Sequence, residues 1–262
     1  MIGLIFGETN FPKYIYKKIK NKKKFIIIDL SKKNIFKSAK NSYQVSVGEF
    51  GKIISILKKN NCKKVLFAGK VKKPNFSRLK LDIKGFYYIS KIIKKSKVGD
   101  AAILREIINI FKKEGIKTIK STFFTPELCL SRGNYSRFRP DKLDKINIKN
   151  AIKLLSKSKS YSHIQAAVGR NNTVILEKQK GTESMLKTIK KKKNRVNGVL
   201  VKFPQKKQDK RIDLPTIGIN TLKQCKMAGL KGIVLKHKEN IFLDRSKSIK
   251  YANKNKLFIF VK

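Results

Sequence analysis

Short apolar segments alternate with amphipathic ones over the first hundred residues, and this alternation restricts the fold more than any other feature of the sequence. The segments that we expect to form strands are 2–6, 25–30, 43–47 and 64–68. Between the last two, Phe50, Ile53, Ile54 and Leu57 recur at helical spacing, which predicts an amphipathic helix. Strands that alternate with helices in this way favour a parallel, right-handed α/β sheet.

The alternation is lost between 132 and 149 and then resumes. A helix is expected at 148–155, followed by a hairpin with strands at 161–168 and 173–177 and a turn at 169–172, Gly-Arg-Asn-Asn. Further strands are expected at 196–201, 232–235, 241–244 and 257–261. The sequence therefore predicts two α/β domains, 1–131 with a mostly parallel Rossmann-like sheet and 150–262, joined by a linker at 132–149.

Two loops follow predicted strands of the first domain, at the edge where open α/β sheets bind ligands. The first begins at Gly7 and the second includes Gly69 and Lys70. A dinucleotide fingerprint would need a second glycine where the chain has Thr9. Both loops are candidates for phosphate contact, although a glycine at a strand end is also an ordinary turn residue.

The segment 208–218, Gln-Asp-Lys-Arg-Ile-Asp-Leu-Pro-Thr-Ile-Gly, gathers acids in a chain dominated by lysine. If it is extended, Asp209, Arg211 and Asp213 face the same side. Two carboxylates can share a cation such as Mg²⁺, and an arginine can grip a phosphoryl group. The alternative is an exposed strand whose charges pair with one another. Thr216 and Gly218 just before a predicted helix favour anion binding.

A second helix start, at Gly181, Thr182 and Glu183, has two interpretations. Thr182 is a natural N-cap, and Glu183 would be stabilised at the positive end of the helix. A glycine and a threonine at this place can equally bind a phosphate.

The net charge of +49 suggests a nucleic-acid or membrane partner. However, only nine of the 65 basic residues are arginine, and the lysines are spread along the whole chain. A composition rich in Lys, Ile and Asn is also typical of an AT-biased genome. A solvated basic surface is therefore the favoured interpretation, with a nucleic-acid-binding protein as an alternative.

The cysteines and the apolar runs indicate a cytoplasmic protein. Cys62, Cys129 and Cys225 are odd in number, far apart and outside any C-x-x-C pattern, which is typical of reduced thiols. The start of the chain shows no signal peptide, and no apolar run approaches the roughly 20 residues of a membrane span. The segment 85–95 mixes aromatic residues with lysines and could lie on a membrane surface, or form an ordinary half-buried helix.

Motifs along the whole chain carry a resemblance to a known family. They are Gly3-Leu-Ile-Phe-Gly7 with Phe11-Pro12, Ala68-Gly69-Lys70-Val71, Gly99-Asp100 with Leu104-Arg105, Gln165, Glu177 with Gly181-Thr182, Met185-Leu186, the segment 208–218, Ala228-Gly229 with Gly232, and Leu257-Phe258. In order and spacing they resemble the metal-dependent UDP-2,3-diacylglucosamine pyrophosphatases of lipid A biosynthesis, in the two-domain form unrelated to calcineurin-like phosphoesterases.

The resemblance implies hydrolysis of the pyrophosphate bond of UDP-2,3-diacylglucosamine by water attack on the α-phosphorus, giving UMP and 2,3-diacylglucosamine 1-phosphate. It also implies a lipid bound between the domains, a homodimer, no nucleic-acid partner, and a peripheral position at the cytoplasmic face of the inner membrane. Asp213 would be the essential carboxylate, Asp209 the second, and Arg211 would neutralise phosphate.

The remaining site residues follow from the same resemblance. Mg²⁺ or another divalent cation would be held by Asp209, Asp213, Glu177 and Glu183. The residues expected to contact substrate are Gly7, Lys70, Gln165, Gly181, Thr182, Lys202, Gln208, Thr216 and Gly218.

The chain departs from the family pattern at three motifs. Thr9 stands where the first loop would have a second glycine, Lys180-Gly-Thr-Glu183 where the family has acidic-Gly-Thr-Asp, and Ser162-His-Ile-Gln165 where it has Asp-x-Gly-Gln. Lys180 thus replaces an acid, and His163 brings a bulky ring to a place where the family has a small residue. A nucleotide-dependent oxidoreductase or transferase is a further alternative. Asp29, at the end of the second strand, would suit it, but the loop before that strand lacks the required glycines.

Overall fold

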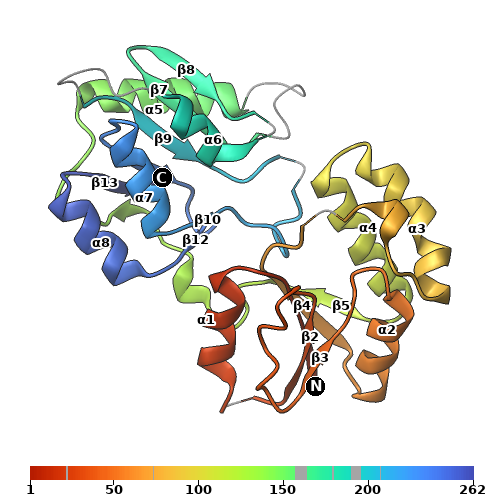
Figure 1. The fold of residues 1–262 in the computed structure, drawn as a ribbon. Coiled ribbons are helices and arrows are strands. Elements are labelled where there is room, and N and C mark those ends of the chain that lie inside the picture. The colour runs from red at the N-terminus through yellow and green to blue at the C-terminus, as the bar shows by residue number, and fades with distance from the viewer. Residues whose placement is uncertain (22, 73, 157–163, 179, 190–195, 207) are drawn as a thin grey trace. The chain divides into compact units, whose positions relative to one another are not determined.

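The computed structural model describes residues 1–262 except 22, 73, 157–163, 179, 190–195 and 207 (Figure 1). The chain forms two compact units. The first contains Met1–Thr125 together with Arg211–Asp213, and the second contains Pro126–Lys210 and Leu214–Lys262. The two-unit α/β architecture predicted from the sequence is confirmed.

The first unit is built on a five-stranded parallel sheet with the order β3-β2-β1-β4-β5. Its strands are β1 Ile2–Phe6, β2 Phe25–Asp29, β3 Ser42–Gln44, β4 Lys64–Ala68 and β5 Lys117–Ile119. Its helices are α1 Asn10–Ile19, α2 Phe50–Lys59, α3 Ile83–Ser96 and α4 Asp100–Lys113, with a short 3-10 turn at Phe76–Arg78. Because the strand order reverses between β1 and β4, the carboxyl ends of these two strands mark the switch point of the sheet.

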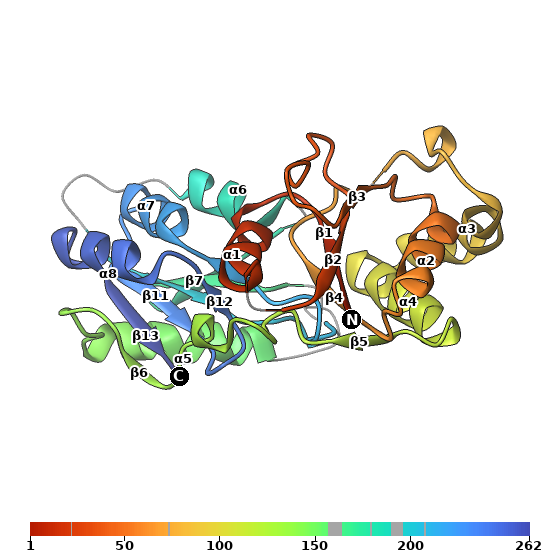
Figure 2. The same cartoon turned by 90° about the horizontal axis from the view of Figure 1, so that it is seen from below.

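Helices cover both faces of this sheet, with α1 on one side and α2, α3 and α4 on the other (Figures 1 and 2). Side chains alternate along β1, so that Ile5 joins the cluster that includes Leu57 of α2. At Gly3 a Cβ atom would lie 2.2 Å from Leu57 Cδ2. The glycine therefore permits close packing of α2 on the sheet.

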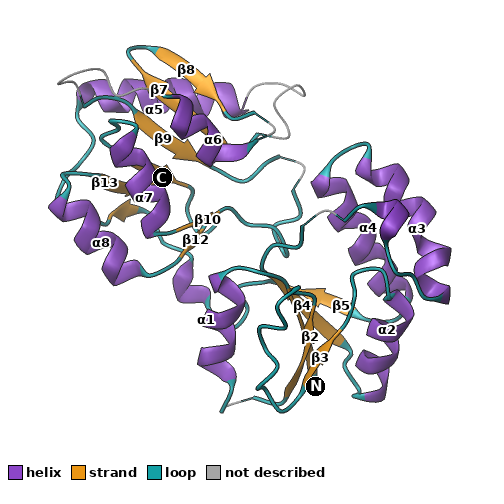
Figure 3. Cartoon of the chain, in the orientation of Figure 1, coloured by secondary structure: helices purple, strands orange, loops and turns teal. Residues whose placement is uncertain are grey.

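The second unit contains a six-stranded mixed sheet with the order β6-β13-β11-β9-β7-β8, and a small parallel pair, β10 and β12 (Figure 3). The strands are β6 Gly133–Asn134, β7 Ala166–Arg170, β8 Thr173–Leu176, β9 Val199–Lys202, β10 Thr216–Ile217, β11 Gly232–Leu235, β12 Ile241–Phe242 and β13 Phe258–Val261. The helices are α5 Lys142–Ser156, α6 Gly181–Thr188, α7 Ile219–Met227 and α8 Arg245–Lys254, with a 3-10 turn at Pro126–Leu128. The three central strands β9, β11 and β13 run parallel.

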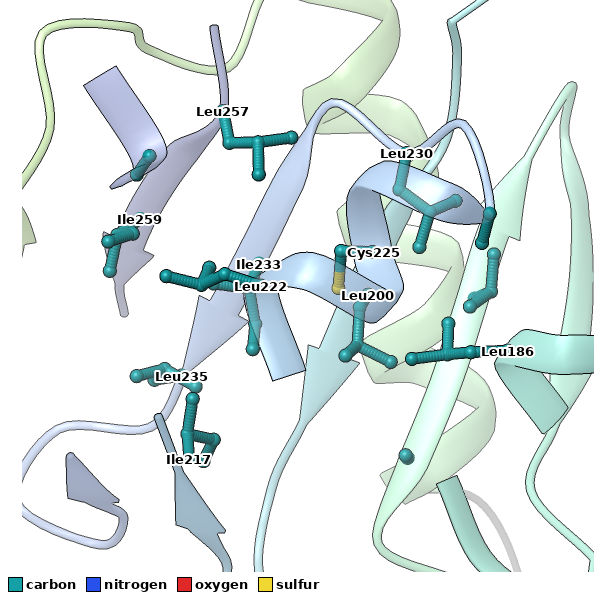
Figure 4. Close-up of a cluster of buried hydrophobic side chains, with 14 of the residues drawn as sticks. Leu186, Leu200, Ile217, Leu222, Cys225, Leu230, Ile233, Leu235, Leu257 and Ile259 are labelled. Atoms are coloured by element: carbon teal, nitrogen blue, oxygen red, sulfur yellow. The ribbon is translucent and has the colours of Figure 1, made fainter. Parts of the chain in front are cut away.

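This sheet also has a core on each face. Leu200 packs into a cluster with residues of α6, α7 and α8, including Leu222 and Cys225 (Figure 4). Its neighbours Val199 and Val201 pack on the opposite face against α5. Within the described residues, no helix is long and apolar enough to cross a membrane.

Two local expectations have clear outcomes in the second unit. The hairpin forms where it is predicted, and Asn171 and Asn172 adopt φ of 48° and 60°, as a two-residue type I′ turn requires. Its first strand begins at Ala166 rather than at 161, and 161–163, which include His163, lie outside the described residues. The segment 132–149, predicted as a linker, instead holds β6, which pairs with β13, and the first half of α5. Lysines between the apolar positions of α5 hide its periodicity, although Ile148 and Ala151 are buried.

Candidate active site

The centre of the candidate site in the second unit is Lys202, the last residue of β9. Its strand lies between β7 and β11, where Ala166 and Leu235 are its register partners. The Lys202 Nζ donates to Thr182 Oγ1 at 2.6 Å, and Thr182 Oγ1 in turn donates to Glu177 Oε2 at 3.2 Å. The hydroxyl of Thr182 therefore connects an ammonium group to a carboxylate.

The side chain of Lys202 is partly buried. Burial lowers the pKa of Lys202, and the nearby negative charge of Glu177 only partly opposes this. Cys225 of α7 also lies near the amine, and complete burial raises the pKa of its thiol to about 12 (Figure 4). A partly buried cation at the end of a strand can interact more strongly with an anionic ligand than an exposed one, because less water screens it.

The N-terminus of α6 supplies Thr182, but not as a helix cap. The helix begins at Gly181, whose φ of +82° favours glycine, and the preceding residue Lys180 makes no side-chain cap. Since the Thr182 hydroxyl contacts Lys202 and Glu177, the capping interpretation is wrong. Glu183 is exposed and pairs with Lys187 at 2.7 Å, and this hydrogen bond lowers the pKa of the Glu183 carboxyl.

A pair of glutamines borders the same end of the sheet. Gln165 Nε2 donates to Gln208 Oε1 at 3.2 Å, and the same oxygen accepts the backbone N–H of Gln205 at 2.7 Å. The N–H of Phe203 donates to the carbonyl of Gln165 at 2.8 Å. These contacts fix the start of the loop after β9, and Gln208 is buried.

The acidic segment that follows is not a strand. A turn occupies 210–212, so the extended conformation expected for 208–214 does not form. Lys210 bonds to Glu239 at 2.8 Å, and the carbonyl of Arg211 accepts the N–H of Ser121 at 2.6 Å. These tertiary contacts override the alternating pattern. Asp209 belongs to the second unit, whereas Arg211 and Asp213 belong to the first.

The end of the acidic motif leads into α7. Thr216 is exposed in β10, and Gly218 is the N-cap residue of α7. The backbone of Gly218 is extended, and a Cβ atom there would meet nothing closer than 3.7 Å. Neither backbone conformation nor packing therefore requires a glycine, although its small size leaves the amide groups at the start of α7 accessible to a ligand.

In the first unit, the two switch-point loops are bonded to each other. The N–H of Glu8 donates to the carbonyl of Lys70 at 2.8 Å, and the N–H of Lys70 returns a bond of 2.8 Å to Glu8. A Cβ atom on Gly7 would lie 2.6 Å from the Lys70 carbonyl oxygen. Gly7 and the backbone of Lys70 thus close this loop pair, while the Lys70 side chain is exposed.

Thr9 has a backbone conformation that favours glycine. Its φ of 104° and ψ of 174° lie in a region that is almost restricted to glycine. The residue directly precedes α1 and makes no side-chain cap. The first loop therefore holds a threonine in a strained backbone conformation.

Asp29, which would suit a dinucleotide site, has a structural role. Its side chain is fully buried, and its two oxygens accept the N–H groups of Ser31 and Phe36 at 2.8 and 3.0 Å. These bonds hold the loop after β2. The carboxylate is used by the protein backbone, which weighs against the oxidoreductase alternative.

The fit of a divalent cation differs among the four predicted carboxylate ligands. Among the described residues, no group of three or more His, Cys, Asp and Glu side chains is placed to hold a metal ion. Lysines neutralise Glu183 directly and Glu177 through Thr182, so a metal would have to displace ammonium groups there. Asp209 and Asp213 offer the oxygen ligands that Mg²⁺ prefers.

One supporting residue was not found by sequence reasoning. Asn240 is buried, its Nδ2 donates to the carbonyl of Lys202 at 3.0 Å, and its Oδ1 accepts the N–H of Lys236 at 2.8 Å. It thereby ties the ends of β9 and β11 together. The sequence feature that could have pointed to Asn240 is its position, in a lysine-rich loop directly before an apolar strand.

Comparison with known proteins identifies the family. The model of the LpxI N-terminal domain matches residues 1–128, and that of the LpxI C-terminal domain matches residues 131–260. A protein of Caulobacter vibrioides, named UDP-2,3-diacylglucosamine pyrophosphatase LpxI, is 34% identical over 223 residues, which cover 82% of this chain and 80% of that protein. Because both domain models match, in order and over nearly the full length, the chain belongs to the LpxI family.

Proposed function

We propose that this protein hydrolyses the pyrophosphate bond of UDP-2,3-diacylglucosamine in lipid A biosynthesis. The observation that carries the proposal is the likeness to a pyrophosphatase of that name, which extends over 82% of the chain. The site geometry supports it, because a partly buried ammonium group, a threonine hydroxyl and the start of a helix are suited to an anionic diphosphate.

In the proposed reaction, the oxygen of a water molecule forms a bond to the α-phosphorus. The bond between that phosphorus and the bridging oxygen breaks, and the bridging oxygen leaves with the sugar phosphate. The products are UMP and 2,3-diacylglucosamine 1-phosphate, and the proton of the water passes to solvent or to a nearby carboxylate.

Each part of the site has a role in this proposal. Lys202 and Thr182 contact the diphosphate oxygens, together with the amide groups at Gly181 and Gly218, while Gln165 and Gln208 shape the pocket beside them. Arg211 neutralises phosphate charge, Asp213 is the essential carboxylate, and Asp209 supports it. A divalent cation held by Asp209 and Asp213 would supply Lewis-acid stabilisation of the phosphate charge.

The proposal also covers the surroundings of the enzyme. The substrate carries acyl chains, so we place the protein peripherally at the cytoplasmic face of the membrane that contains it. The homodimer implied by the family resemblance is kept as a prediction. Light scattering of the purified protein would measure its mass in solution, and a monomer at assay concentration would contradict the dimer.

The deciding experiment follows UMP release from UDP-2,3-diacylglucosamine, with Mg²⁺ and with a chelator. We expect release with Mg²⁺ and its loss with the chelator, restored by added metal. Release that persists in the chelator would contradict the metal requirement but not the proposed hydrolysis. No release under either condition would contradict the proposed function. UDP-N-acetylglucosamine, which lacks the acyl chains, is the matched control substrate.

A further inference from the structure

Helix α3 and the residues just after it expose large apolar side chains to an unusual degree. Among the described residues, five large apolar side chains are more than 60% exposed, and four of them lie between 83 and 98: Ile83 at 91%, Phe86 at 75%, Tyr87 at 64% and Val98 at 74%. Ile83, Phe86 and Tyr87 are spaced to share one side of the helix. We call these three residues the α3 ridge.

The opposite side of α3 is packed in the ordinary way. Tyr88 and Ile92 are buried in the core of the first unit. At Gly85 a Cβ atom would lie 2.0 Å from the carbonyl oxygen of Gly48, so the glycine lets the helix approach this backbone closely. The packing of α3 on the first unit therefore uses the inner face of the helix, and the side chains of the ridge take no part in it.

Polar contacts at the start and in the first half of α3 fix the direction of the ridge. Asp82 caps two helices at once, because its carboxylate accepts the N–H of Gly85 in α3 at 2.7 Å and that of Lys52 in α2 at 2.8 Å. Glu114, after α4, bonds to Lys84 at 2.5 Å and to the hydroxyl of Tyr88 at 3.2 Å. Ile83, Phe86 and Tyr87 are consequently held outward by a rigid support.

The charge around the ridge has a single sign. Residues 83–98 contain five lysines and no acid: Lys84, Lys91, Lys94, Lys95 and Lys97. The Nζ of Lys91 lies 5.3 Å from the centre of the Tyr87 ring. Aromatic and aliphatic side chains beside long, flexible cations are the combination that suits the boundary between lipid headgroups and acyl chains.

We propose that the α3 ridge inserts into the surface of an anionic phospholipid bilayer, with the surrounding lysines bound to lipid phosphates. A second copy of the chain fits this surface less well, because two identical faces with five lysines each would repel. Nucleic acid would match the charge but offers no acyl layer for Ile83 and Val98. The bilayer satisfies both the apolar and the cationic groups.

The inference deepens the peripheral placement proposed above, because it names the surface that would contact the bilayer, but it does not depend on the proposed hydrolysis. It is carried by the exposure, support and charge of α3. Vesicle binding can therefore fail while UMP release persists, and the reverse is equally possible.

The first test uses the fluorescence of a single tryptophan introduced at the ridge. The chain contains no tryptophan, so Phe86→Trp introduces one indole at the ridge. With vesicles of phosphatidylcholine and phosphatidylglycerol we expect a blue shift of its emission and quenching by brominated acyl chains. Met227→Trp, at a residue of α7 that is 77% exposed, is the matched control and should show neither effect. An unshifted Phe86→Trp spectrum, or an equal shift in both variants, would overturn the proposal.

The second test measures sedimentation with the same vesicles. Replacing all three ridge residues by serine should weaken binding by about tenfold or more, because their apolar area is lost to the bilayer. The matched control replaces Leu143, Ile146 and Met227 by serine and should leave binding within about twofold. Thermal melting verifies folding, and the single variant Ile83→Ser serves if the triple variant does not fold.

Charge is tested in parallel. Replacing Lys91, Lys94 and Lys97 by glutamine should weaken binding to anionic vesicles by about tenfold or more. The same change at Lys13 and Lys17 of α1 and at Lys20, which directly follows this helix, should weaken binding much less. Equal losses in the two lysine sets would show adhesion by net charge and overturn the inference. So would ridge variants that keep vesicle binding but lose self-association or oligonucleotide binding.

Discussion

The two units of this protein differ in how they use buried and partly buried polar side chains. In the first unit the carboxylates of Asp29 and Asp82 accept backbone N–H groups, and Glu114 joins the ends of three helices. In the second unit, a series of side chains bond to one another, from Glu177 through Thr182 to Lys202. The carboxylates of Asp29 and Asp82 are thus bound by the protein backbone, whereas Glu177 and Lys202 are connected through the hydroxyl of Thr182.

The difference separates structural groups from groups that are available for chemistry. A carboxylate that accepts two backbone amides has fixed geometry and a defined partner, as at Asp82. Burial opposes the charge on Asp82, but the donations from Gly85 and neighbouring amides outweigh it and lower the pKa. An ammonium group carries three N–H donors, and Thr182 accepts only one of those of Lys202. The second arrangement can take up a phosphate without dismantling the fold.

The largest effect should come from the acidic motif. We expect Asp213→Asn to reduce kcat for UMP release by roughly 10³-fold and Asp209→Asn by somewhat less, because charge stabilisation of the phosphate is lost. Thermal melting should change little, since both residues lie in a loop. The comparison residue is Asp82, where Asp82→Asn should lower the melting temperature with little change in kcat. Normal turnover in both motif variants would contradict the assigned roles.

Removal of the buried amine is the next test. Lys202→Met should lower kcat/KM by about 10²-fold, because a desolvated cation is lost from the diphosphate site. The free energy of unfolding should change by less than about 1 kcal/mol, since an apolar side chain of similar length avoids the cost of burying a charge. Lys187→Met, at the exposed partner of Glu183, is the matched control and should retain activity.

The pH dependence gives an independent check of Lys202. Its pKa is lower in the folded protein than the ordinary 10.5, so the cation should be lost, and activity with it, as pH rises through a value below 10.5. Over the same interval the unfolded chain binds more protons at this residue, and its contribution makes stability rise with pH. An alkaline limb that is unchanged in Lys202→Arg would show that another group controls it.

Glu114 should affect stability without affecting turnover. The hydrogen bond from Lys58, followed by that from Lys84, lowers the pKa of its carboxyl from 4.5 to about 2. Because the folded pKa is depressed, the stabilisation is complete above pH 4.5 and is lost as pH falls through about 2. Both lysines are about half exposed, so screening limits the loss in Glu114→Gln at pH 7 to about 1–2 kcal/mol. Chemical denaturation at pH 7 and pH 3 measures it, and equal losses at both would contradict the linkage.

The smallest effect should be at Thr9. Thr9→Gly relieves a conformation that costs about 1–3 kcal/mol, but glycine also gains entropy in the unfolded chain. The net gain in the free energy of unfolding should be on the order of 1 kcal/mol. Thr9→Ala, which keeps a Cβ atom, should give no such gain. A glycine variant less stable than the alanine variant would show that the strain is absent.

Local patterns in the sequence determined much of the architecture. The strands 2–6 and 64–68 and the helix at 50–57 follow from apolar periodicity, and the hairpin turn follows from the asparagines at 171 and 172. These features depend on residues close in sequence, and their backbone preferences suffice. The motifs also located the segment 208–218 and the start of α6, although not the conformation of either.

Only the tertiary structure decided which polar groups meet. The sequence has lysine at almost every tolerable position, so nothing local distinguishes Lys202 from the others. Its burial arises because β9 lies at the centre of a sheet whose neighbours, β7 and β11, come from distant parts of the chain. The alternating acids of 208–214 predict a strand, but the bonds of Lys210 to Glu239 and of Arg211 to Ser121 impose a turn. Such contacts join residues that are at least 29 positions apart in the sequence. No short-range pattern can therefore encode them.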